Sequence, residues 1–135
     1  MIEKINDMHV LYSVELQLDR DQIITVGKLG TFHFQRGTYI YIGSAKRAII
    51  SRLNRHKKVD KVKRWHIDYL RPFCEITKII TYELGDGECS LAEKLRKTKE
   101  GTLPIPGFGA SDCKCRSHLI YLGAHHSKKE QSQSS

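Results

Sequence analysis

The chain has 135 residues, of which 39% are hydrophobic, and it carries a formal net charge of +8. This length supports one hydrophobic core but not two, and no segment approaches the roughly 18 apolar residues that would cross a membrane. We therefore expect a single folded domain over residues 1–126 and a disordered polar tail over residues 127–135. The lack of a targeting segment favours a soluble, cytoplasmic protein.

The first part of the chain has the alternating pattern of β-strands. Alternation predicts a strand over residues 8–18, and two short runs around a glycine-containing loop predict a hairpin over residues 23–35. A further strand over residues 38–42 enters a turn at Gly43 and Ser44. Three or four strands therefore precede the first helix.

Helices follow in the second part of the chain. Ile49 and Leu53, four residues apart, predict a helix with one buried stripe. The elements expected here are helices over residues 45–56 and 64–70, a strand over residues 75–83, a helix that begins at Glu88 and a strand over residues 118–122. This order favours an α/β (α+β) fold in which a small central sheet, mixed or antiparallel, is flanked by helices.

The positive charge is concentrated in one segment. Nine basic residues and one acid, Asp60, lie between Lys46 and Arg64, and the rest of the chain is balanced. A charge run often forms only a solvated helix face. Because the whole excess lies together, we favour contact with a polyanion such as nucleic acid. The candidate DNA-binding residues are Lys46, Arg47, Arg55, Lys57, Lys58, Lys61, Lys63 and Arg64.

Two tyrosines on the strand before Gly43 are candidate site residues. Because side chains alternate along a strand, Tyr39 and Tyr41 project to one face and the two isoleucines beside them to the other. We expect the isoleucine face to be buried and the other to carry the phenols. Tyrosine is also common in strands through β-propensity alone. The Gly-Ser turn favours a site, because it brings the next helix, and Arg52 with it, beside the Tyr41 hydroxyl.

The helix that begins at Glu88 carries its apolar residues at helical spacing from that carboxylate. Leu91, Ala92 and Leu95 lie three, four and seven residues later, so Glu88 shares their face. We expect the carboxylate to point along the core face toward the sheet. The alternative is an acid stabilised only by the helix dipole, which requires no inward direction.

Four cysteines in a chain without an export signal argue against a disulfide framework and leave thiols or a metal site. Cys113, Cys115 and His118, together with Cys89, could form a tetrahedral zinc site. The alternative is that these small residues fasten the final loop to the preceding helix, with Asp112 or His118 near a cleft.

Four features of the chain resemble the GIY-YIG nucleases. Tyr41-Ile42-Gly43 is similar to the second half of the family signature, and Arg52 to the arginine on the following helix. His56 is similar to the histidine one turn later, and Glu88 to the metal-binding glutamate of a later helix. The resemblance runs from about residue 8 to residue 122.

The chain is more similar to a small, mainly archaeal branch of that family, related to excision-repair and intron-encoded endonucleases. Five blocks in the same order carry this resemblance, over residues 37–45, 52–56, 65–70, 88–92 and 107–113. Only Val10-Leu11-Tyr12 corresponds to the first half of the signature, without its glycine, and the extra N-terminal hairpin separates it from Tyr41. Tyr12 and Tyr39 are therefore both candidates for the second tyrosine.

The resemblance implies phosphodiester hydrolysis in DNA repair or recombination with one divalent metal. Glu88 would hold Mg²⁺ or Mn²⁺, which prefer oxygen ligands. A tyrosine has a reference pKa of about 10, so it needs Arg52 and the metal nearby to take a proton from water. Arg52 would also offset the charge of the transition state. His56 would orient a tyrosine or assist proton transfer, or else fill the core.

The partner that the resemblance implies is DNA, and the family suggests a repair glycosylase or another repair protein beside it. Trp65 or Phe108 could stack on unpaired bases near the cleft. Two alternatives stay open, a non-catalytic nucleic-acid-binding module of the same fold and a zinc-stabilised adaptor. DNA affinity that falls with salt, without cleavage, would select the first. Zinc in freshly purified protein would select the second.

Overall fold

The structure is a mixed α+β fold built on one five-stranded sheet. The computed structural model describes residues 1–109 and 116–124. In the order in which they lie side by side, the strands are β1 (Ile2–Lys4), β6 (Glu75–Tyr82), β2 (Leu11–Leu18), β5 (Gly37–Ser44) and β7 (Leu119–Gly123). β1 runs parallel to β6 and the other neighbours are antiparallel, so the sheet is mixed.

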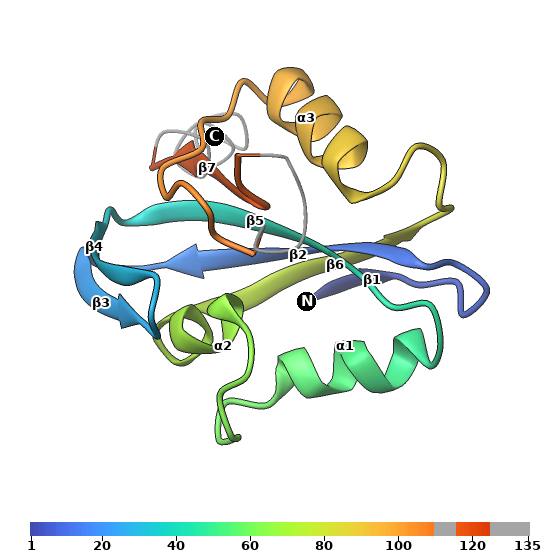
Figure 1. Cartoon of the computed structure of the whole chain (residues 1–135), viewed down its shortest axis with the longest axis horizontal. Coiled ribbons are helices and arrows are strands. Elements are labelled where there is room, and N and C mark those ends of the chain that lie inside the picture. Colours follow the sequence, from blue (N-terminus) through green and yellow to red (C-terminus); the bar gives the residue numbers. More distant parts are fainter. Residues whose placement is uncertain (110–115, 125–135) are drawn as a thin grey trace, which may run out of the picture.

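Helices cover both faces of this sheet (Figure 1). The covering elements are α1 (Ile49–Lys57), α2 (His66–Leu70), the 3-10 turn η1 (Arg71–Phe73), α3 (Glu88–Thr98) and a hairpin of β3 (Gln22–Val26) and β4 (Gly30–Phe34). α1 and α2 lie on one face and α3 on the other. The hairpin stands apart from the main sheet and packs against α2. A small sheet flanked by helices is the arrangement that the order of elements predicts.

Both faces of β5 are buried, each by different neighbours. Tyr39 and Tyr41 belong to a cluster with apolar residues of β2, α1 and α2. Ile40 and Ile42 pack on the opposite face against Ala92 of α3. The isoleucine face is therefore buried as expected. The phenol face is buried as well, because α1 and α2 cover it.

β5 continues through Gly43 and Ser44, so the predicted turn at these residues is wrong. Gly43 pairs with Tyr12 of β2, and a Cβ at position 43 would overlap the Tyr12 hydroxyl. The glycine therefore makes room for a neighbouring ring. Because the strand is longer than expected, α1 begins at Ile49 instead of at residue 45.

Strand β1, near the N-terminus, completes the five-stranded sheet. The sequence predicts no strand at β1, which forms one edge of the sheet with three exposed residues. The predicted tail over residues 127–135 lies outside the described residues. Within residues 1–109 and 116–124, no helix is both long enough and apolar enough to cross a bilayer.

Candidate active site

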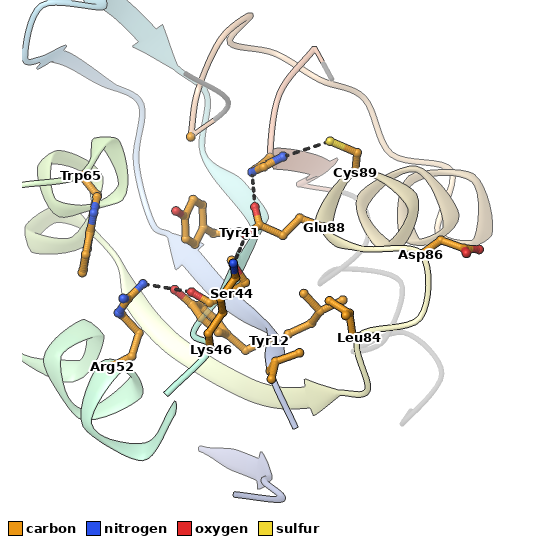
Figure 2. A pocket seen from close by; sticks show the side chains of 15 residues that line it. Tyr12, Tyr41, Ser44, Lys46, Arg52, Trp65, Leu84, Asp86, Glu88 and Cys89 are labelled. Carbon is orange, nitrogen blue, oxygen red and sulfur yellow. Dashed lines mark hydrogen bonds and ion pairs between the residues drawn. The ribbon is translucent and has the colours of Figure 1, made fainter. Parts of the chain in front are cut away.

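A pocket of about 490 Å³ lies where β2, β5, α1 and α3 meet. Tyr12, Tyr41, Arg52 and Glu88 line it, one from each of these elements (Figure 2). Seventy-six residues separate the first of them from the last. The sheet and its helices therefore bring together a phenol pair, a guanidinium and a carboxylate that the sequence singled out separately.

Tyr12 and His56 form a buried hydrogen-bonded pair behind this pocket. The Tyr12 hydroxyl lies 2.7 Å from Nε2 of His56, and the two side chains are 1% and 2% exposed. Burial raises the pKa of Tyr12 to about 12, although Arg52 opposes the effect. Burial also lowers the pKa of His56 to about 3. At neutral pH the phenol therefore keeps its proton, the imidazole is neutral, and the two groups share a hydrogen bond.

Tyr41, and not Tyr39, shares the pocket with Tyr12. The Tyr12 and Tyr41 ring centroids are 6.5 Å apart, and burial raises the pKa of Tyr41 above its ordinary value. Tyr39 lies farther along β5, where its hydroxyl donates to the Gln35 carbonyl oxygen at 2.5 Å and its ring lies 4.7 Å from that of Tyr121. The geometry therefore favours Tyr12 as the partner of Tyr41.

Arg52 reaches the pocket from α1 without a carboxylate partner in the part of the chain that the structure describes. Its Nη1 donates to the Ser44 carbonyl oxygen at 3.0 Å. Its Cζ lies 4.5 Å from the centroid of the Trp65 ring. Across residues 1–109 and 116–124, no carboxylate oxygen lies within 4.0 Å of the Arg52 nitrogens. The guanidinium is thus oriented by neutral groups, which leaves its positive charge for an anion.

Glu88, the first residue of α3, points back toward the sheet as its helical spacing predicts. One carboxylate oxygen accepts a hydrogen bond from the Ser44 hydroxyl, and the other lies 3.1 Å from Nδ1 of His118 (Figure 2). The Glu88 side chain is 29% exposed, whereas that of His118 is 2% exposed. Burial lowers the pKa of His118, and the Glu88 carboxylate opposes this effect. His118 and Ser44 therefore fix the direction of an accessible carboxylate.

The basic segment divides into exposed and internally paired side chains. The exposed candidates are Lys46, Arg47, Lys58, Lys63 and Arg64, and Lys46 also lines the pocket. Arg55 and Lys61 instead reach the buried Asp68, at 2.9 Å and 3.5 Å, and Lys57 forms an ion pair with Glu3. The surface available to a polyanion is therefore narrower than the charge count indicates.

The structure adds pocket residues that sequence reasoning missed. Leu84, in the loop between β6 and α3, is 58% exposed and lines the end of the pocket opposite Trp65 (Figure 2). Ser44, expected only as a turn residue, contacts both Glu88 and Arg52. No local pattern identifies such residues, because their roles depend on strand pairing and on packing across the sheet.

Two expectations about aromatic and sulfur groups change. Phe108 is fully buried against Tyr41, at 6.2 Å between centroids, so the expectation that it stacks on bases is wrong. Cys89 is disulfide-bonded, so the expectation that the cysteines form no disulfide is wrong for this residue. Cys113, Cys115 and Asp112 lie outside the described residues, so their proposed roles stay predictions.

Comparison with known proteins identifies a family and no activity. A family model described as "Domain of unknown function DUF123" matches residues 11–135. The match begins at the first residue of β2 and includes Tyr12, Tyr41, Arg52 and Glu88. No curated protein and no solved structure matches the chain.

Proposed function

Because the chain belongs to the DUF123 family, a domain of unknown function, we propose its activity from the pocket. In this proposal the protein is a metal-dependent endonuclease that hydrolyses phosphodiester bonds in DNA during repair or recombination. It is also a divergent member of the GIY-YIG nucleases. The observation that carries this proposal is the convergence of Tyr12, Tyr41, Arg52 and Glu88 on one pocket. These groups can bind a phosphate, oppose its charge and move a proton.

Phosphate binding falls to Arg52 and Lys46. Arg52 has no carboxylate partner within the described part of the chain, and Lys46 is exposed beside it at the pocket wall. A guanidinium held by neutral groups needs little reorganisation when a phosphate arrives. It stabilises the additional negative charge of the transition state for the same reason.

The metal site would be built on Glu88. Within residues 1–109 and 116–124 no three metal-binding side chains gather. Glu88 has the Ser44 hydroxyl beside it, and Asp86 is a second carboxylate in the pocket lining. That donor set is all oxygen and sparse, which suits Mg²⁺ or Mn²⁺ with a shell completed by water and phosphate. A bound ion would supply Lewis-acid polarisation of the phosphate.

Proton transfer would use one phenol of the Tyr12 and Tyr41 pair. Burial keeps both phenols protonated in the isolated protein, and Arg52 is the cation that most opposes this for Tyr12. His56 is a poor proton acceptor, because its pKa is about 3. Its role in this scheme is to fix the orientation of the Tyr12 hydroxyl through the 2.7 Å hydrogen bond.

The test is cleavage of duplex, flap, bubble and single-stranded DNA with Mg²⁺ or Mn²⁺. Arg52→Gln and Glu88→Gln should each reduce nicking by about 100-fold or more while the protein stays folded. Matched controls are Arg20→Gln and Glu75→Gln, which change exposed residues outside the pocket. Full activity in either pocket variant would overturn its assigned role.

A binding module without turnover is the second candidate. It is favoured by the raised pKa values of Tyr12 and Tyr41, which oppose their use as bases. Salt-dependent DNA binding with no cleavage of any substrate, with either metal, would select this function.

A further inference from the structure

The indole of Trp65, the only tryptophan in the chain, has two guanidinium groups against it. The Cζ atoms of Arg52 and Arg55 lie 4.5 Å and 4.3 Å from its centroid. Trp65 directly precedes α2, whereas both arginines belong to α1. The ring therefore joins two helices at the edge of the pocket.

The two arginines differ in how their charges are balanced. Arg55 donates to both carboxylate oxygens of Asp68, at 3.0 Å and 2.9 Å. Asp68 is 1% exposed, and one of its oxygens also accepts the backbone N–H of Trp65 at 3.0 Å. Burial by itself raises the pKa of Asp68, but these hydrogen bonds outweigh it and lower the pKa to about 2. Arg55 is thus paired with a carboxylate, whereas within the described residues Arg52 donates to a neutral carbonyl oxygen and lies against a neutral ring, with no carboxylate partner.

This difference matters for a group that must bind a phosphate. A carboxylate would orient Arg52 equally well, but it would compete with the phosphate for the same donors. An aromatic face attracts a cation and leaves its N–H edge free. Arg55 is instead held by a bidentate contact to Asp68, a carboxylate that Lys61 also reaches, so the donors of Arg55 are occupied and do not compete for the anion.

We propose that Trp65 is a positioning residue that holds Arg52 in its phosphate-binding orientation, and that the Arg55–Asp68 pair fixes Trp65 in turn. This inference rests on the proposed function for the role of Arg52. It replaces stacking of Trp65 on an unpaired base, because the ring already contacts two guanidinium groups.

The first experiment needs no DNA. Ring currents of the indole should shift the Hε resonances of Arg52 and Arg55 upfield in the NMR spectrum of the whole chain. Trp65→Leu should return both resonances to ordinary positions, and Trp65→Phe should retain part of the shift. The matched control is Phe73→Leu, which changes an aromatic residue that is 45% exposed outside the pocket. An Arg52 resonance that does not move in Trp65→Leu overturns the proposal.

The second experiment separates positioning from base stacking. At saturating DNA, Trp65→Leu should slow single-turnover cleavage by about tenfold. Its DNA affinity should stay within about twofold of that of the unmodified protein. Trp65→Phe should recover most of the cleavage rate. In an Arg52→Ala background, Trp65→Leu should have no further effect. Weaker binding of single-stranded DNA with an unchanged rate would identify a base-stacking residue and overturn the proposal. If the unmodified protein cleaves nothing, the proposed function fails, and the NMR experiment still decides whether Trp65 orients Arg52.

Discussion

The hydroxyl of Tyr12 forms a hydrogen bond with Nε2 of His56, although 44 residues separate them along the chain. The bond joins β2 to α1 beneath the pocket, and both groups are almost completely buried. Each side chain is the partner that the other needs, because a buried polar group without one is costly. The pair therefore contributes both to the stability of the fold and to the orientation of a candidate catalytic phenol.

Replacing His56 by leucine should destabilise the protein. His56→Leu keeps bulk but removes the hydrogen-bond partner of the Tyr12 hydroxyl, so the free energy of unfolding should fall by about 1–3 kcal/mol. Urea denaturation measures this change. In the same variant, Tyr12→Phe should cost less than it does in the unmodified protein, because the hydrogen bond is already absent. Equal costs in both backgrounds would show that the two groups are not coupled.

The same histidine predicts how stability depends on pH. His56 has a folded-state pKa of about 3 and an ordinary value of 6.5, so only the unfolded chain gains a proton between these values. The contribution of the buried, neutral His56 to the free energy of unfolding is therefore complete above pH 6.5. It falls by about 1.4 kcal/mol for each pH unit below that value. Between pH 6.5 and about 4.5, above the range in which Asp68 titrates, His56→Leu should lack this slope. Identical slopes for both proteins would contradict the assignment.

Gly43→Ala should disturb Tyr12 more than the backbone. A Cβ at this position would overlap the Tyr12 ring and hydroxyl, and the backbone of Gly43 does not itself require glycine. We expect a loss of about 1–3 kcal/mol of stability by denaturation. In a Tyr12→Ala background the same substitution should cost much less. An equal cost in that background would place the strain elsewhere.

Metal affinity should depend on the residues that hold Glu88. Glu88→Gln should abolish specific Mn²⁺ binding, as measured by calorimetry or by electron paramagnetic resonance, whereas Glu75→Gln should not. His118→Asn should weaken Mn²⁺ binding by about 10- to 100-fold, because His118 orients the carboxylate. Unchanged affinity in Glu88→Gln would remove this carboxylate from the site.

DNA binding should follow the exposed basic residues. Lys58→Ala and Lys63→Ala should each reduce the slope of log affinity against log salt by about 0.9 if the residue contacts a phosphate of duplex DNA. The matched control is Lys94→Ala, which removes an exposed lysine from α3 on the opposite face of the sheet. Equal effects at all three positions would indicate non-specific attraction.

Local patterns predicted the parts of the site that depend on neighbouring residues. The spacing of Leu91, Ala92 and Leu95 predicted the inward direction of Glu88, because one helix face carries them all. The strand and the following helix likewise predicted Tyr41 and Arg52 in one region. The first prediction needed only the periodicity of one helix, whereas the second relied on a turn at Gly43 and Ser44, where the strand instead continues.

Pairings between distant segments could not be read from the sequence. Tyr12 became the partner of Tyr41 through the register of β2 against β5, in which Tyr12 lies opposite Gly43. The internal pairing of Arg55 depends on Asp68, which belongs to another helix. β1 has only three residues, too few for a periodic pattern, and pairs with β6 from more than 70 residues away. In each case the deciding contact is non-local.

Trp65 is the only tryptophan in the chain and lies at the pocket, so its fluorescence can report ligand binding in the unmodified protein. Trp65 lines the cavity and contacts Arg52, so its ultraviolet emission should respond when an anion reaches that guanidinium. Titrations with nucleotides, oligonucleotides or metal ions can therefore be followed without labels, before any turnover is detected.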